Sequence, residues 1–346
     1  MTKNNTVLVT GGAGYIGSHT TRHLLAAGYD VLVIDNLYSG HRWAVAPQAR
    51  FIEADVGDRA RIDPLFKEHD ITAVVHFAGH IVVPESVGDP FKYYRNNSFA
   101  SYNLIQSAHQ AGVSRFIFSS TAAVYGIPHT VPVKESDDTR PINPYGRSKL
   151  ITEWMLRDLS HADQINNKQP PFRYVALRYF NVAGAALDGS LGQATPEATH
   201  LIKVASEAAC GLRDQVAIFG TDYATADGTC IRDYIHVEDL AAAHVKALDY
   251  LYADGEAAIL NCGYGRGYSV REVLNTVRQV SNVDFPIVES DRRPGDPPEL
   301  MADNTRIQEV LGWHPQHDDL VMICDSAFKW EQTLRQRSKA AGSDLV

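Results

Sequence analysis

Short apolar runs alternate with longer amphipathic stretches along the first half of the chain. The stretches with helical spacing cover residues 18–27, 59–69 and 90–111, and a further helix is expected to begin at Pro144, after the capping residue Asn143. The apolar runs, which we interpret as strands, cover residues 6–10, 31–35, 51–55, 73–77, 115–121 and 174–181. Strands that alternate with helices predict an α/β fold with a doubly wound parallel sheet of the Rossmann type.

The alternation ends near Asn181, which predicts a boundary there. A stretch rich in glycine, alanine and threonine runs to Thr199, and charged and aromatic residues gather in short runs beyond it. We therefore expect a first domain, residues 1–181, and a smaller C-terminal α/β lobe, residues 182–346, with room for C-terminal segments to pack back onto the first domain. Residues 160–171 are expected to form a mobile loop, and residues 336–346 a frayed tail.

A glycine-rich turn follows the first predicted strand. Gly11, Gly14 and Gly17 precede a predicted helix, and Asp35 ends the second strand eighteen residues beyond Gly17. Such glycines let the backbone approach a diphosphate at a helix N-terminus, and the acid accepts hydrogen bonds from ribose hydroxyls. Because Asp35 would repel a 2′-phosphate, this order of elements predicts binding of NAD rather than NADP.

Tyr145 and Lys149 lie four residues apart at the start of the helix that follows Asn143. On one helical face, the ammonium group favours the ionised phenol, so we expect the pKa of Tyr145 to fall from about 10 toward neutrality. Thr121 ends the fifth strand, and ligands of such sheets bind beyond the carboxyl ends of the strands. A Tyr-x-x-x-Lys motif also arises by chance on surface helices, so the glycine turn and Thr121 carry the catalytic interpretation.

Composition and charge exclude several classes of protein. The 346 residues carry a formal net charge of −9 with scattered lysine and arginine, so nucleic acid is not an expected partner. The chain has no long apolar run, and its first residues lead directly into a strand, which predicts a cytoplasmic protein without membrane association.

The cysteine and histidine spacing predicts no metal site. His19 and His23 share a helical face without a third ligand nearby, and we interpret them as structural. The four cysteines are widely spaced and are expected to be isolated buried thiols rather than disulfides: Cys210, Cys230, Cys262 and Cys324.

Several of these motifs resemble the extended short-chain dehydrogenase/reductase family and, more closely, its UDP-glucose 4-epimerases. The resemblance covers nearly the whole chain and rests on residues 9–19, 118–120, 124–126, 144–149, 178–181, 227–229 and 232–236. It implies reversible inversion at C4 of a UDP-hexose, with interconversion of UDP-glucose and UDP-galactose, by an NAD that is reduced and reoxidised in one turnover. It also implies an NAD-binding first domain, a UDP-sugar-binding second lobe and a homodimer that pairs residues 90–111 and 145–159.

The motifs and the resemblance together define the candidate site. Catalytic roles fall to Tyr145, Lys149 and Thr121. The NAD-binding residues are expected to be Gly11, Gly14, Tyr15, Ile16, Gly17, Asp35, Asn36, Asp55, Val56, Phe77, Ala78, Gly79, Asn97, Ser119, Ser120, Tyr145, Lys149 and Tyr179. The residues expected at the UDP-sugar are Thr121, Tyr145, Phe180, Asn181, His200, Leu201, Ala217, Phe219, Arg232, Tyr234, Arg293, Asp296 and Leu300.

The chain departs from the family pattern at three positions. Thr121 replaces a serine but keeps the hydroxyl, and Ile81 replaces a lysine of some members, so a cofactor or phosphate contact made there is not carried over. Leu300 stands where some members have tyrosine, which leaves open whether an N-acetyl group fits. Epimerases of UDP-N-acetylglucosamine, of a UDP-uronate or of a UDP-pentose therefore remain alternatives.

Two further alternatives are less favoured. A 4,6-dehydratase would need an acid and a base after Thr121, where this chain has Ala122 and Ala123. A non-catalytic NAD-binding sensor would have no reason to keep Thr121, Tyr145 and Lys149 together.

Overall fold

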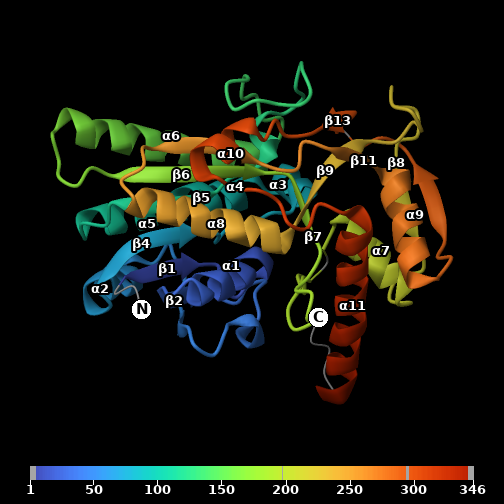
Figure 1. The fold of residues 1–346 in the computed structure, drawn as a ribbon, viewed down its shortest axis with the longest axis horizontal. Coiled ribbons are helices and arrows are strands. Elements are labelled where there is room, and N and C mark those ends of the chain that lie inside the picture. Colours follow the sequence, from blue (N-terminus) through green and yellow to red (C-terminus); the bar gives the residue numbers. More distant parts are fainter. Residues whose placement is uncertain (1–4, 197, 294–295, 342–346) are drawn as a thin grey trace.

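The main sheet has seven strands, all parallel, in the order β10-β6-β5-β4-β1-β2-β3 (Figure 1). The computed structural model describes residues 5–196, 198–293 and 296–341. The strands are β1 (Thr6–Thr10), β2 (Asp30–Asp35), β3 (Arg50–Glu53), β4 (Ile71–His76), β5 (Arg115–Ser119), β6 (Arg173–Tyr179) and β10 (Ala258–Cys262). Each of the six runs predicted as strands forms one of them, and the doubly wound α/β class is confirmed.

Helices cover both faces of this sheet. The side chains of each strand point alternately to the two faces, so each face has its own hydrophobic core. Val7 and Val9 of β1 belong to one core, while Leu8 belongs to the other. The first core includes α1 (Tyr15–Ala26) and α8 (Val237–Tyr252). The second includes α2 (Arg59–Glu68), α5 (Ala100–Gln110) and α6 (Pro144–Ile165).

The second lobe is built from short strands and three longer helices. The strand β9 (Ile231–His236) pairs with β7 (Asn181–Ala183), β11 (Gly267–Ser269) and β13 (Glu299–Leu300), while β8 (Val216–Phe219) pairs with β12 (Ile287–Ser290). The three helices are α7 (Leu201–Ala209), α9 (Val270–Ser281) and α11 (Leu320–Ala341), while α10 (Thr305–Leu311) packs against β10 and α8. Although β10 and α8 follow Asn181 in the chain, they belong to the layers of the main sheet.

The predicted helix over residues 90–111 is not continuous. It begins as α4 (Pro90–Tyr93), widens into the π-helical turn η2 (Tyr94–Phe99) and continues as α5. Before it lies the short helix α3 (Val83–Gly88), and two single 3₁₀ turns, η1 (Arg42–Ala44) and η3 (Ala122–Val124), occur elsewhere in the first domain.

Two segments predicted to be irregular are helical in part, whereas residues 166–171 contain neither helix nor strand, as predicted. Residues 160–165 continue α6, because the buried side chain of Asp163 accepts hydrogen bonds from the N–H of Phe172 at 2.9 Å and pairs with His109 at 2.9 Å. Helix α11 extends through Ala341, and Leu334 is buried within it, so the tail prediction is wrong for residues 336–341. Residues 1–4 and the last part of the predicted tail, 342–346, lie outside the described residues.

A buried ion pair joins α6 to the sheet. Arg178 of β6 donates to Glu153 of α6 through Nε at 3.0 Å and Nη2 at 2.6 Å, and their side chains are only 4% and 1% exposed. The Ser120 hydroxyl donates to the same carboxylate, and Arg178 also donates to the Tyr125 hydroxyl at 3.0 Å. Tyr125 in turn donates to Asn261 of β10 at 2.6 Å, so the network ties α6 to three adjacent strands.

The structure also bears on the membrane and cysteine predictions. Within the described ranges, none of the helices combines the length and apolar character needed to cross a bilayer. All four cysteines are buried free thiols, as predicted.

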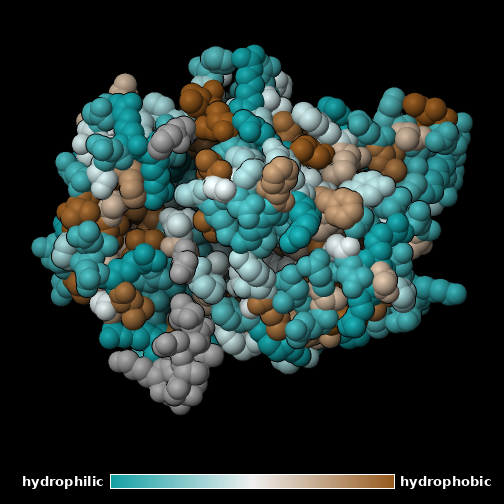
Figure 2. All heavy atoms as spheres, turned by 180° about the vertical axis from the view of Figure 1, so that it is seen from behind, coloured by the Kyte–Doolittle hydropathy of each residue, from teal (hydrophilic) through white to brown (hydrophobic). Residues whose placement is uncertain are grey.

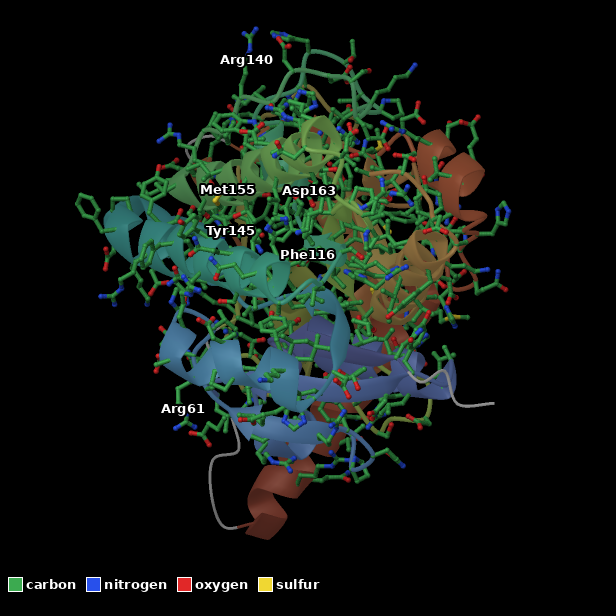
Figure 3. All side chains as sticks on the ribbon, turned by 90° about the vertical axis from the view of Figure 1, so that its left-hand side faces the viewer. Arg61, Phe116, Arg140, Tyr145, Met155 and Asp163 are labelled. Atoms are coloured by element: carbon green, nitrogen blue, oxygen red, sulfur yellow. The ribbon has the colours of Figure 1, made fainter. Side chains whose placement is uncertain are left out.

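Breaking this buried pair from one side should cost stability. Glu153→Leu leaves the Arg178 cation buried without its carboxylate, so the free energy of unfolding in urea should fall by about 3 kcal/mol. The double variant Glu153→Leu/Arg178→Met removes both charges and should be destabilised less than the single variant. Arg140→Met is the control, because Arg140 lies at the outer edge of the molecule, 71% exposed in its pair with Asp138 (Figure 3). A single variant as stable as the wild type would contradict this role.

Candidate active site

The N-terminus of α6 positions Tyr145 and Lys149. Asn143 caps the helix, with its Oδ1 accepting from the Gly146 N–H at 2.8 Å, and Pro144 occupies the first turn. This is the start predicted from the sequence. Tyr145 and Lys149 are both buried and both line one large cavity at the carboxyl ends of the strands.

Lys149 lies beside the carboxyl end of β5. Its ammonium group donates to the carbonyl oxygen of Ser119 at 2.9 Å. Burial lowers the pKa of Lys149 to about 8. Gly79 lies against this cation, since a Cβ there would be at van der Waals distance, 3.5 Å, from the Lys149 Nζ. The lysine is therefore held against the sheet, next to the turn that follows β4.

The electrostatics of Tyr145 differ from the prediction. Burial raises the pKa of its phenol, and a hydrogen bond with Thr121 opposes that rise. The expectation that Lys149 brings this pKa down toward neutrality is wrong for the protein chain by itself, because desolvation of the phenolate is the dominant effect. The placement of Thr121 beside Tyr145 follows the prediction.

The glycine turn after β1 forms a cradle for a diphosphate. Gly11 has a φ of +70°, and a Cβ there would lie 2.7 Å from the backbone nitrogen of Ala78. A Cβ at Gly17 would lie 2.2 Å from the carbonyl oxygen of Gly11, so neither position accepts a side chain. Gly14 is the N-cap of α1, whose first turn contains no acidic residue and faces the cavity. These features fit the anionic centre of a dinucleotide.

The acids after β2 and β3 lie at the same edge of the cavity. Asp35 accepts hydrogen bonds from the backbone N–H groups of Ala13 at 3.0 Å and Leu37 at 2.8 Å. The side chain of Asn36 donates to Asp55 at 2.9 Å. A ribose and a base attached to the diphosphate would therefore meet a fixed carboxylate, which fits NAD.

One cavity of about 1280 Å³ collects nearly all the predicted site residues. The whole predicted UDP-sugar set lines it, as does the predicted NAD set except for Asn97 and Ser120. Asn97 lies behind the wall, where it exchanges two hydrogen bonds with the backbone of His80, at 2.8 and 2.9 Å. Ser120 is turned toward Glu153. Asn97 and Ser120 therefore support the cavity wall from behind, and the cofactor contacts predicted for them stay predictions.

The second lobe contributes two arginines and an aromatic ring to the cavity. Arg232 of β9 pairs with Asp296 at 3.5 Å, and the Arg293 guanidinium lies 3.7 Å from the centroid of the Phe219 ring. Leu300 of β13 pairs with Arg232 in the sheet register. Two arginines that face the same cavity can pair with phosphate groups.

Several cavity residues were missed by sequence reasoning. They include Tyr38, His80, Arg213, Gln215 and Cys230, all of which line the cavity. Tyr38 lies two residues after the predicted contact Asn36, and His80 follows the predicted contact Gly79. Proximity along the chain was therefore an available signal. Arg213 lies in a turn after α7, where the sequence carries no comparable signal.

The histidines have structural partners. His19 and His23 of α1 both bond the Glu238 carboxylate at the start of α8, as the structural interpretation requires. Among the described residues, no group of His, Cys, Asp or Glu side chains is arranged to hold a metal ion.

Comparison with known proteins agrees with this geometry. Residues 7–263 match the NAD dependent epimerase/dehydratase family. A UDP-glucose 4-epimerase of Azospirillum brasilense is 54% identical over 97% of this chain and 95% of its own length. The UDP-glucose 4-epimerase of Brucella ovis, solved with NAD, has a TM-score of 0.89 at 45% identity, covering 94% of this chain and 97% of that one.

A third relative, the UDP-glucose 4-epimerase of Bifidobacterium longum, was solved with NAD⁺ and UDP. Its TM-score is 0.88 at 38% identity, covering 95% of this chain and 98% of that one. The family match covers well over half of the chain, and the relatives match it over nearly their full length. The chain therefore belongs to the NAD-dependent epimerase/dehydratase family.

Proposed function

We propose that this cavity binds a UDP-hexose beside NAD and inverts its C4 centre, interconverting UDP-glucose and UDP-galactose. The reaction is NAD-dependent UDP-glucose 4-epimerisation, an isomerisation. The single observation that carries the proposal is the position of Tyr145 and Thr121 between the glycine cradle and the arginines of the second lobe, in one cavity. Residues 1–181 supply most of the NAD contacts, and residues 182–346 supply most of the UDP contacts.

Tyr145 is the acid and base of the reaction. Its phenolate oxygen takes the proton of the sugar 4-hydroxyl in the oxidation, and the phenol returns a proton to the C4 oxygen in the reduction, when hydride reaches C4 on the opposite face. NAD, when bound, accepts the C4 hydrogen as hydride and returns it, and its positively charged form adds to the local positive charge. Burial favours the neutral phenol, so the Thr121 hydrogen bond and the charge of Lys149 have to favour the phenolate in the loaded site.

The 4-keto sugar must present both of its faces for the second hydride transfer, while the nucleotide stays fixed. Arg232 and Arg293 hold the diphosphate from the second lobe, away from the reacting carbon. Ala122 and Ala123 also line the cavity and carry neither an acid nor a base, which disfavours elimination of water by a dehydratase.

The protein forms a homodimer in this proposal. Large apolar side chains are exposed along residues 90–111 and 145–159: Phe91 is 83%, Phe99 59% and Trp154 46% exposed. The Phe99 and Tyr102 rings stack on each other at 6.3 Å and are both open to solvent. The face seen in Figure 2 is mainly hydrophilic, with hydrophobic residues scattered over it. Exposed aromatic residues on adjacent helices are typical of a subunit interface.

We propose that the enzyme is cytoplasmic. The support is that Cys210, Cys230, Cys262 and Cys324 are all free thiols, as is usual in a reducing compartment.

The proposed activity predicts turnover without added NAD. Purified wild-type protein should convert UDP-galactose to UDP-glucose using the NAD that it carries. Tyr145→Phe removes the group that moves the proton, so turnover should fall at least about a thousand-fold. The variant should still release NAD when it is denatured, since the glycine cradle is unchanged.

A tyrosine outside the cavity provides the control for this variant. Tyr250→Phe, in α8, should keep the wild-type rate. Undiminished turnover in Tyr145→Phe would reject the assignment of the acid and base, and wild-type protein that carries NAD but leaves UDP-galactose unchanged would favour the sensor.

The proposed dimer can be tested by the mass of the protein in solution. Sedimentation of the wild type should give twice the chain mass of 38.1 kDa. Phe99→Glu/Trp154→Glu puts charges on the exposed aromatic face, and these variants should sediment as monomers because a buried unpaired charge is costly. A wild-type protein that remains monomeric at high concentration would rule out the dimer.

A further inference from the structure

Two turns that line the cavity contact each other at its rim. The turn after β2 carries Tyr38, and the turn after β4 carries His80, both of which line the cavity. Their rings pack edge to face, with centroids 4.7 Å apart and planes at 74°. In the sheet, β1 lies between β2 and β4. The contact therefore spans the carboxyl end of β1, where the glycine cradle begins.

A hydrogen bond from α4 reinforces this contact. The Lys92 ammonium donates to the Tyr38 hydroxyl at 2.9 Å and lies 5.1 Å from the centroid of the Tyr38 ring. The same ammonium is paired with Glu85 of α3. The bonds to Glu85 and then to Tyr38 raise the pKa of Lys92, so the lysine stays charged at neutral pH. Lys92 also brings a cation to the rim where Ile81 replaces the lysine of some family members.

The turn that carries Tyr38 is held in a fixed shape. Leu37 has a left-handed φ of +57°, and its N–H donates to Asp35 at 2.8 Å. The Tyr38 N–H donates to the side chain of Asn36 at 3.1 Å. The tyrosine therefore projects from a turn that is built on the ribose-binding carboxylate itself.

On the other side of the rim, α3, α4 and the turn after β4 are anchored to the protein interior. Tyr93 is fully buried, and its hydroxyl donates to Glu85 at 2.9 Å and to the carbonyl oxygen of Val82 at 2.6 Å. The His80 backbone is fixed because its N–H donates to Asn97 Oδ1 and its carbonyl oxygen accepts from Asn97 Nδ2. Of the contacts that cross the rim, the Tyr38–Lys92 bond and the Tyr38–His80 ring contact lie nearest to solvent, since Tyr38 is 61% exposed.

We propose that Tyr38, Lys92 and Glu85 form a clasp over the diphosphate of the bound dinucleotide and slow its release. This inference rests on the NAD binding proposed above. The clasp joins the turn at the ribose end to the segment beside Lys149, so the middle of the dinucleotide passes beneath it. A dinucleotide that leaves over the glycine cradle has to part Tyr38 from Lys92 and His80. A cofactor that is regenerated in every turnover benefits from such slow exchange.

The test is the rate at which the holoenzyme releases NAD. The protein is mixed with an excess of an unrelated alcohol dehydrogenase and its alcohol, and free NAD is detected as NADH absorbance. Lys92→Met and Tyr38→Phe each remove the hydrogen bond, while Tyr38→Phe keeps the ring against His80. Each should raise the release rate about five-fold, because the pair is partly exposed and its contribution is modest. The double variant should release NAD no faster than Lys92→Met alone, since both changes remove one bond.

Lys329→Met is the matched control, because it removes an exposed lysine–carboxylate pair with Asp325 on α11, far from the rim in the chain. It should release NAD at the wild-type rate. The clasp is overturned if Lys92→Met also releases NAD at that rate, if Lys329→Met speeds release equally, or if the two rim changes multiply in the double variant. Wild-type protein that carries no NAD would overturn the proposed function itself, whereas bound NAD with equal release rates would overturn the clasp alone.

Discussion

The geometry of the site depends on a buried ion pair that lies outside the cavity. Glu153 stands four residues after Lys149 and eight after Tyr145, so the three side chains share one face of α6. Arg178 holds Glu153 through two hydrogen bonds, and Ser120 adds a third from the end of β5. This network sets how far α6 lies along the sheet, and so it sets where the phenol of Tyr145 meets Thr121. A shift of α6 would move the proton-transferring group without changing any residue of the cavity.

The two lobes contribute in different ways. The first lobe presents backbone groups and short side chains at the ends of strands, which a fixed dinucleotide requires. The second presents long side chains on loops and short strands, such as Arg232 and Arg293, which line the cavity and which we propose bind the diphosphate. This division suits a reaction in which the nucleotide stays anchored and the sugar turns over between two hydride transfers.

Much of this arrangement was predictable because its signals are local in sequence. Six of the seven strands of the main sheet, the glycine turn with Asp35, and the cap at Asn143 each depend on neighbouring residues. The seventh strand, β10, lies beyond the predicted boundary and was not predicted. The remainder depends on residues far apart in the chain. The raised pKa of Tyr145 comes from burial, the π-turn places Asn97 behind His80, and the Tyr38–Lys92 bond joins two separate turns. The extension of α6 likewise depends on the contact of Asp163 with Phe172 and His109. Such contacts exist only once the sheet has assembled.

The central claim is that one hydride leaves C4 of the sugar and returns to the same carbon within a closed site. The most direct measurement uses UDP-galactose with deuterium at C4, incubated with the purified protein in ordinary water without added NAD. The account predicts UDP-glucose that keeps the deuterium at C4, since Tyr145 exchanges only the hydroxyl proton with solvent. UDP-glucose that carries hydrogen from water at C4 would contradict it.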